Sequence, residues 1–172
     1  MYGDSTLSVG TEFPAFTLSG VNGDNELKSF SSEDIEGWSV FYFYPKDFTF
    51  ICPTEIAAMD RLVDEGVNVF GFSGDNEFCK LNWKIFNSQI REIRHPLIAD
   101  SGLYLSHDLG IVQDGLCLRA TFIVDPEGII QHISVNALDT GRNVDEVIRT
   151  LKALQAGGLT GCSWQEGDDF VA

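Results

Sequence analysis

Cys52 is the residue in this sequence best placed to act as a nucleophile. It follows residues 40–44, a continuous apolar run typical of a buried strand, and it precedes Pro53, which is favoured in the first turn of a helix. A cysteine at a helix N-cap faces the positive end of the helix dipole and unpaired backbone N–H groups, and both favour the thiolate. The sequence therefore predicts a reactive thiolate at the N-cap of a helix, in the position between strand and helix where open α/β sheets bind ligands.

A thiolate in that position needs a nearby cation, and Arg119 is the best candidate. Asp47 and Glu55 are close to Cys52 in sequence and would oppose its ionisation if they faced the sulfur. Arg119 lies in residues 117–124, an otherwise apolar strand in which an unpaired guanidinium would be costly to bury. We therefore expect the fold to bring Arg119 to the sulfur, although an ordinary salt bridge on an edge strand would also explain this residue.

The spacing of the other cysteines excludes a paired-thiol motif. The four cysteines lie at positions 52, 79, 117 and 162, so the chain has no Cys-x-x-Cys motif for zinc or for a thioredoxin-type dithiol. We expect Cys79 and Cys117 to be core or interface residues. Period-two alternation would place Cys117 on the same strand face as Arg119, where it could be a further reactive thiol. The three histidines show no ligand spacing, and Trp83 and Trp164 are expected to pack rather than to bind substrate.

Hydrophobic periodicity predicts the elements that position these residues. Residues 39–73 are predicted to form a strand, a helix that ends at Gly66 and a second strand, in a right-handed parallel crossover. The further predicted elements are a helix over 76–90, a short strand over 97–99, a hairpin of strands 117–124 and 129–135, and a helix from 143 to 157. This order predicts an α/β fold, a thioredoxin-like three-layer sandwich around a mixed central sheet. We expect a domain over 1–156 and a C-terminal tail over 157–172.

Charge and composition narrow the classes of function. The 172 residues include 11 Lys and Arg against 26 Asp and Glu, a net charge of −15. Proteins that bind nucleic acid or anionic membranes need clustered basic residues, and none are present here. The longest apolar run is far shorter than a membrane-spanning helix requires, and the start of the chain has no targeting pattern. With its isolated cysteines, the chain is expected to be cytoplasmic.

An ordered set of motifs connects the sequence to a known family. Pro45-x3-Thr49-x2-Cys52 is followed by Pro53-Thr54-Glu55, and kindred segments follow in order at 73–78, 83, 96–100, 108–110, 118–123 and 141–142. With these motifs the chain resembles the peroxiredoxins nearly end to end, in particular the alkyl hydroperoxide reductase C (AhpC) type with two working cysteines. The resemblance implies a thioredoxin-like fold with an extra N-terminal hairpin, and a thiol peroxidase that reduces hydrogen peroxide and organic hydroperoxides.

The resemblance also implies roles for particular residues. Cys52 would attack the hydroperoxide and become a sulfenic acid, with Thr49, the Cys52 backbone N–H and Arg119 stabilising the departing oxygen. Pro45 would shield the sulfur from water, and Glu55 would brace Arg119 and Arg142, without any metal, haem or flavin. Simpler interpretations stay open, because Thr49 could be a turn residue, and Glu55 and Arg142 could be helix-end charges.

The tail departs from the family pattern. The usual resolving cysteine lies four residues before a tail tryptophan, and Thr160 occupies that place here, whereas Cys162 lies two residues further on. We expect Cys162 of a neighbouring subunit to form the intersubunit disulfide with Cys52, although it could be an incidental tail thiol. The Tyr-Phe extension and the Gly-Gly-Leu-Gly insertion of some relatives are missing, which predicts easier local unfolding, quicker resolution and resistance to overoxidation.

Partners and rival functions follow from the same resemblance. The reductant would be a dithiol protein, namely thioredoxin, an AhpD-type thiol protein or the flavoprotein AhpF, and homodimers would assemble into a decamer or dodecamer ring. A disulfide oxidoreductase is the rival within enzymes, and the missing Cys-x-x-Cys motif argues against it. A non-catalytic holdase chaperone or a redox-sensing interaction protein is the rival from another class.

Overall fold

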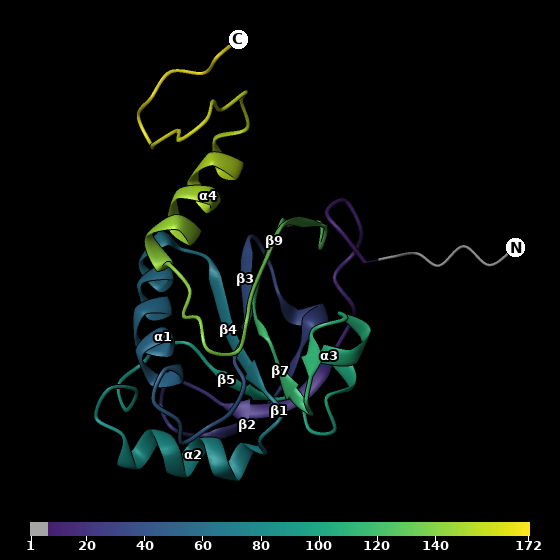
Figure 1. The fold of residues 1–172 in the computed structure, drawn as a ribbon, viewed down its shortest axis with the longest axis vertical. Helices are drawn as coiled ribbons and strands as arrows, with labels where there is room; N and C mark the ends of the chain where they lie inside the picture. The colour runs from purple at the N-terminus through teal and green to yellow at the C-terminus, as the bar shows by residue number, and fades with distance from the viewer. Residues whose placement is uncertain (1–6) are drawn as a thin grey trace, which may run out of the picture. The chain divides into compact units, whose positions relative to one another are not determined.

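A seven-stranded mixed sheet forms the framework of the first part of the chain in the computed structural model, which describes residues 7–172 (Figure 1). The strand order is β2-β1-β5-β4-β3-β8-β9, with β3, β4 and β5 parallel and the others antiparallel to their neighbours. The strands are β1 (Thr17–Val21), β2 (Leu27–Ser31), β3 (Ser39–Phe43), β4 (Asn68–Ser73), β5 (Leu97–Ala99), β8 (Arg119–Val124) and β9 (Ile130–Asn136), with β6 (Val112–Gln113) and β7 (Leu116–Cys117) forming a separate pair.

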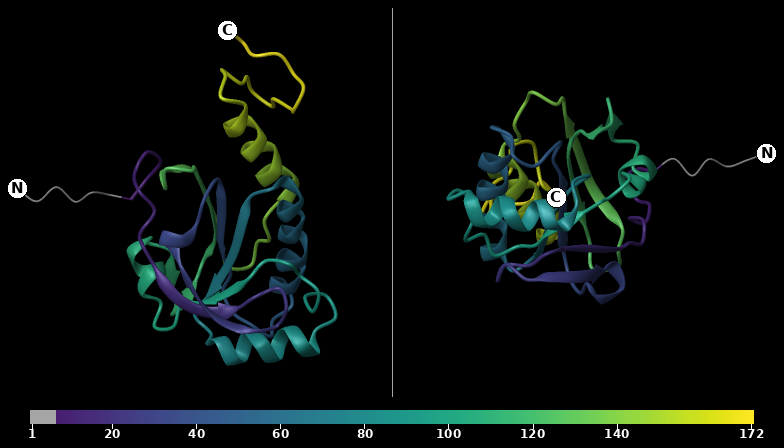
Figure 2. Two further views of the ribbon diagram at one scale, coloured as in Figure 1. Left: turned by 180° about the vertical axis from the view of Figure 1, so that it is seen from behind. Right: turned by 90° about the horizontal axis from the view of Figure 1, so that it is seen from below.

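Helices cover both faces of this sheet. The helical elements before Asn143 are η1 (Ser32–Asp34), α1 (Cys52–Met59), η2 (Asp60–Glu65), α2 (Glu77–Phe86) and α3 (Tyr104–Asp108), and α4 (Val144–Ala156) follows in a separate unit described below. Both figures show α1 and α3 on opposite sides of the sheet (Figure 1, Figure 2). The predicted thioredoxin-like fold is therefore confirmed, including the parallel crossover β3-α1-β4 and the N-terminal hairpin of β1 and β2.

Alternation along β3 gives the two faces different chemistry. Phe41 and Phe43 belong to an aromatic core that also contains Phe72 and Phe122, and the rings of Phe43 and Phe72 stack with centroids 4.7 Å apart. Tyr42 points to the opposite face, because successive side chains of a strand alternate. The apolar face thus fixes β3 in the sheet, and the polar face supplies groups near the start of α1.

The first helix begins one residue earlier than the sequence predicts. Ile51 is the N-cap, and Cys52 is the first helical residue rather than the N-cap itself. Ile51 already has helical dihedral angles (φ −79°, ψ −42°), and its carbonyl accepts hydrogen bonds from the backbone N–H groups of Thr54 and Glu55 at 3.1 and 3.3 Å. The α-helix continues as the 3-10 helix η2 and ends, as predicted, at Gly66, which has a left-handed φ of 74°.

Two other predictions were wrong in their boundaries. The second helix ends at Phe86 instead of residue 90, because Asn87 has an extended backbone. The strand predicted over 117–124 is split at Leu118. The backbone N–H of Leu118 donates to the carbonyl of Ile111, and the Leu118 carbonyl accepts a hydrogen bond from the N–H of Ala120. Cys117 consequently packs in the aromatic core and does not share a strand face with Arg119.

The packing divides the chain into two compact units, the first ending at Arg142 and the second running from Asn143 to Ala172. Helix α4 begins as predicted, with the Asn143 side chain accepting from the N–H of Glu146 at 3.1 Å, and ends at Gly157. The predicted division into 1–156 and 157–172 stays a prediction, and residues 1–6 lie outside the described residues. Between residues 7 and 172, no helix is long and apolar enough to cross a bilayer.

The second unit folds its tail into a closed loop. Arg149 in α4 donates to the carbonyl of Trp164 at 3.0 Å, and the Trp164 indole N–H donates to the carbonyl of Asp168 at 3.1 Å. The rings of Trp164 and Phe170 stack with centroids 6.4 Å apart. Cys162 lies in this loop and is exposed to solvent, so within its own unit its thiol is accessible for reaction.

Candidate active site

Cys52 is completely buried at the point where the loop after β3 enters α1. Pro45, the second residue of the loop after β3, is buried as well, so this part of the loop helps to keep solvent from the region. The sulfur lies in the first turn of α1, where backbone N–H groups have no partner within the helix. Burial and the helix terminus together give a thiol that is shielded from water and exposed to a positive electrostatic potential.

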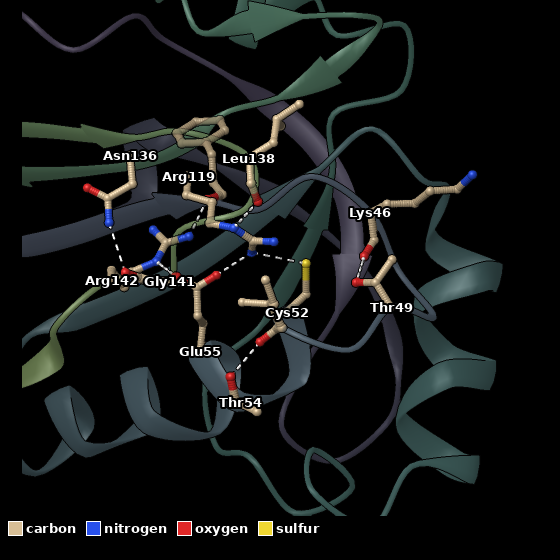
Figure 3. Close-up of polar contacts among 12 residues, drawn as sticks. Lys46, Thr49, Cys52, Thr54, Glu55, Arg119, Asn136, Leu138, Gly141 and Arg142 are labelled. Atoms are coloured by element: carbon tan, nitrogen blue, oxygen red, sulfur yellow. Dashed lines mark hydrogen bonds and ion pairs between the residues drawn. The ribbon is translucent and has the colours of Figure 1, made fainter.

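Arg119, 67 positions later in the sequence, contacts the Cys52 sulfur. Its Nη1 donates to Sγ of Cys52 at 3.3 Å, and the same nitrogen pairs with the carboxylate of Glu55 (Figure 3). Its Nε donates to the carbonyl of Leu138 at 2.6 Å. Arg119 is only 5% exposed. The guanidinium is therefore held in one orientation from two sides, with one nitrogen directed at the sulfur.

Glu55 connects Arg119 to a second buried arginine. Its other carboxylate oxygen accepts from Nε of Arg142 at 2.6 Å and from the Arg142 backbone N–H at 2.9 Å. Arg142 also donates to the carbonyl of Ala120 at 2.8 Å and to the Thr121 hydroxyl at 3.0 Å, which ties it to β8. A buried carboxylate with two guanidinium partners is neutralised, so Glu55 does not act as an unpaired negative charge beside the sulfur.

Thr49 is half-buried in the loop before α1, and its hydroxyl donates to the carbonyl of Lys46 at 2.9 Å (Figure 3). A hydroxyl whose proton is used in this way presents oxygen lone pairs to a ligand. In this conformation the Thr49 oxygen can accept a further hydrogen bond, and the role expected for Thr49 beside the departing oxygen stays a prediction. The structure brings Cys52, Glu55, Arg119 and Arg142 into one connected cluster.

Asp47 does not face the sulfur, and its partners were not predicted from the sequence. Its carboxylate accepts from the Tyr44 hydroxyl at 2.7 Å, from the Ser73 hydroxyl at 3.1 Å and from the ammonium group of Lys80 at 3.2 Å. The side chains of Asp47 and Lys80 are fully buried. One feature of the sequence could have indicated that Lys80 is buried. Lys80 lies three residues before Trp83, on the same face of the helix, and Trp83 is buried.

Comparisons with known proteins show the family of this chain. Residues 9–133 match the model of the AhpC/TSA family. The chain belongs to the AhpC/TSA family. It is 40% identical over 182 residues to an alkyl hydroperoxide reductase C of Mycolicibacterium smegmatis, covering 96% of this chain and 93% of that protein. It is 34% identical to peroxiredoxin-1 of Gallus gallus, covering 95% and 89%.

Solved structures of AhpC/TSA relatives show the same fold. The reduced 2-Cys peroxiredoxin of Plasmodium vivax is similar with a TM-score of 0.89 and 34% identity, covering 95% of this chain and 92% of that chain. Mycobacterium tuberculosis AhpC is similar with a TM-score of 0.80 and 39% identity, covering 87% and 98%. The likeness therefore extends over nearly all of the chain and is not confined to the motif around Cys52.

The other two cysteines of the first unit of this AhpC/TSA protein are poor nucleophiles near neutral pH. Cys117 is buried with its sulfur 3.1 Å from the hydroxyl of Ser106, and burial raises the pKa of its thiol to about 11. Burial also raises the pKa of Cys79 to about 11, and the negative charge of Asp47 adds to this increase. All four cysteines are free thiols. Among residues 7–172, no three His, Cys, Asp or Glu side chains are grouped as metal ligands.

His95 is a buried histidine with both ring nitrogens occupied, as expected for a structural residue. Nδ1 lies 2.7 Å from Oδ1 of Asp60, and Nε2 contacts the hydroxyl of Tyr42. Burial lowers the pKa of His95, although the hydrogen bond to Asp60 opposes this shift. Burial raises the pKa of Tyr42 well above 10, so its hydroxyl stays protonated. The ring of Tyr42 in turn lies beneath the guanidinium of Arg142, at 5.2 Å.

Proposed function

We propose that this protein is a thiol peroxidase that reduces hydrogen peroxide and organic hydroperoxides with Cys52 as the nucleophile. The observation that carries the proposal is the buried Cys52 sulfur with Nη1 of Arg119 at 3.3 Å. The names of the relatives, alkyl hydroperoxide reductase C and peroxiredoxin-1, support the same chemistry. They favour a peroxidase over a disulfide oxidoreductase or a non-catalytic holdase.

The first step oxidises Cys52. The thiolate attacks the terminal oxygen of the hydroperoxide, so that an S–O bond forms while the O–O bond breaks. Cys52 becomes a sulfenic acid, and the departing oxygen leaves with the electron pair of the broken bond and takes up a proton as water or alcohol. Arg119 stabilises the sulfur before reaction and the developing negative charge on the departing oxygen during it. Thr49 accepts a hydrogen bond from the O–H of the hydroperoxide and so orients the substrate.

The second step returns the enzyme to its thiol form. Cys162 of a neighbouring subunit attacks the sulfenic acid, forming the Cys52–Cys162 disulfide and releasing water, and a dithiol protein then reduces that disulfide. Thioredoxin, an AhpD-type protein and an AhpF-type flavoprotein share the required dithiol chemistry. The intersubunit disulfide requires at least a homodimer. We further propose that the homodimers assemble into a decamer or dodecamer ring and that the protein is cytoplasmic.

Two cysteine variants test the assignment. Cys52→Ser should consume no peroxide, whereas Cys162→Ser should reduce about one equivalent per subunit and then stop when a dithiol protein is the donor. Cys79→Ser serves as the matched control and should retain full multiple turnover. Multiple turnover by Cys52→Ser would overturn the proposed function, and multiple turnover by Cys162→Ser would overturn only the choice of resolving cysteine.

A further inference from the structure

Residues 46–51, the part of the loop between β3 and α1 that leads into Cys52, have one buried side chain, that of Asp47. Of residues 46–51, Asp47 alone is buried, while the others are half-buried or exposed, and Phe50 is 96% exposed. The Thr49 hydroxyl bonds within the loop, to the carbonyl of Lys46. Asp47 therefore provides the buried side-chain attachment of this segment, which leads to Cys52.

The attachment of Asp47 is an ion pair removed from solvent. Lys80 in α2 donates to both carboxylate oxygens of Asp47, at 3.2 and 3.4 Å, and it also bonds to the hydroxyls of Tyr44 and Ser73. Both charged side chains have no exposed surface. Removing one partner of such a pair leaves an uncompensated buried charge, which strongly destabilises the conformation that buries it. The closed position of the loop therefore depends on this pair.

The backbone next to Asp47 has a conformation that needs support. Phe48 has a φ of 58°, in the left-handed region that non-glycine residues seldom adopt. The backbone N–H of Asp47 donates to the carboxylate of Asp75 at 2.7 Å, and the Phe48 ring lies against Trp83 with centroids 5.9 Å apart. Without the anchor at Asp47, the strain at Phe48 favours release of the loop.

Cys52 has two tasks in the proposed function, and they require different loop positions. Reaction with peroxide uses the buried sulfur beside Arg119, whereas disulfide formation requires the sulfur to leave its buried position and meet the thiol of another subunit. A completely buried sulfur cannot be reached by a second protein chain. The balance between the closed and the open loop therefore controls the relative rates of the two steps.

We propose that the buried Asp47–Lys80 ion pair is a latch that sets this balance, holding the Cys52 loop closed for peroxide reduction and limiting the rate of disulfide formation. Asp47 and Lys80 are positioning residues, because neither contacts the sulfur. The inference rests on the proposed function. It predicts that weakening the latch changes the two steps in opposite directions, whereas general damage to the fold would slow both.

Lys80→Met tests the latch, and Lys84→Met is the matched control. Both lysines are completely buried in α2, but the ammonium group of Lys84 donates to the carbonyl of Asn22, away from the loop. In quenched-flow mass spectrometry with hydrogen peroxide, Lys80→Met should slow oxidation of Cys52 about tenfold or more and should speed disulfide formation severalfold, because one lost partner weakens the closed loop. Lys84→Met should leave both rates within about twofold, because it removes a buried lysine from the same helix but leaves the Asp47–Lys80 pair intact.

Hydrogen exchange reports the loop position directly. In Lys80→Met the amides of residues 46–51 should exchange about tenfold faster or more, because the closed state is weakened. The amides of β4 should be unaffected. Unchanged exchange in the loop, or equal slowing of both chemical steps, would overturn the latch.

A second set of variants keeps the test decisive if Lys80→Met does not fold. Asp47→Asn has nearly the same shape and should show the same opposite changes in the two rates. In the double variant Asp47→Asn/Lys80→Met, the combined effect on Cys52 oxidation should be smaller than the product of the single effects, because each change removes the same pair. Independent effects would reject the ion pair as the latch. Failure of the unaltered protein to form a Cys52 sulfenic acid would instead reject the proposed function.

Discussion

The Nη1 atom of Arg119 lies 3.3 Å from the Cys52 sulfur and donates a hydrogen bond to it across 67 positions of sequence. The contact is directional because the same guanidinium is held by the Leu138 carbonyl and by Glu55. A preorganised donor of this kind stabilises negative charge without reorganisation during the reaction. The geometry therefore places one preorganised cationic donor at the Cys52 sulfur.

Removing the Arg119 guanidinium should slow peroxide reduction strongly. We expect Arg119→Met to lower the rate constant for oxidation of Cys52 by about 10² to 10³-fold, the usual cost of losing one preorganised donor. Arg119→Lys should be intermediate, because an ammonium group keeps the charge but cannot contact the sulfur, Glu55 and the Leu138 carbonyl together. Rapid-mixing measurements of Cys52 oxidation check this, and an unchanged rate in Arg119→Met would contradict the assigned role.

Loss of the Glu55 charge should cost stability as well as activity. Glu55→Gln leaves two buried guanidinium groups without their shared carboxylate, and we expect the free energy of unfolding to fall by about 3–5 kcal/mol. Glu146→Gln is the control, because the pair that Glu146 forms with Arg149 is partly exposed to solvent and should contribute about 0–1 kcal/mol. Urea unfolding of both variants provides the measurement, and equal losses would argue against a special role for the buried cluster.

The thiols of Cys79 and Cys117 should resist alkylation near neutral pH. With a pKa of about 11, each is almost entirely protonated at pH 8, and the thiol form does not react. In the folded protein, iodoacetamide should modify both residues slowly at pH 8 and progressively faster towards pH 11. Peptide mass spectrometry would detect the modification, with the protein in denaturant as the control. Modification at pH 8 as rapid as in denaturant would show that burial does not protect these thiols.

The sequence was sufficient to predict the crossover that positions Cys52, because β3, α1 and β4 have long apolar periodic patterns. It also predicted the approach of Arg119, since an arginine in an apolar strand requires a partner. It could not predict the Asp47–Lys80 pair, because a lysine on an amphipathic helix is ordinarily solvated and its partner lies 33 positions away. The sequence also could not predict that Cys117 lies in the core, away from the strand face of Arg119. That placement depends on the break between β7 and β8 at Leu118, and an alternating pattern of side chains assumes an unbroken strand.

Acid should destabilise the fold through His95 and Asp60. Burial lowers the pKa of His95, so below about pH 6.5 the unfolded chain takes up a proton at this residue that the folded chain does not. The free energy of unfolding therefore decreases as the pH is lowered. Burial alone would raise the pKa of Asp60, but hydrogen bonds from His95 and Arg94 lower it below 3.8 overall, which adds a second loss at more acidic pH. Urea unfolding at pH 7.5 and 5.5 tests the first effect. His95→Gln should flatten the difference, and an equally steep decline in that variant would contradict it.

The most direct test of the central claim is to locate the oxygen after one equivalent of hydrogen peroxide, by non-reducing peptide mass spectrometry with a sulfenic acid trap. In Cys162→Ser, the proposed chemistry predicts one trapped sulfenic acid on Cys52, with Cys79 and Cys117 unmodified, and in the unaltered protein it predicts a Cys52–Cys162 disulfide. The proposed chemistry would be contradicted if Cys52 were unmodified while Cys79 or Cys117 was oxidised.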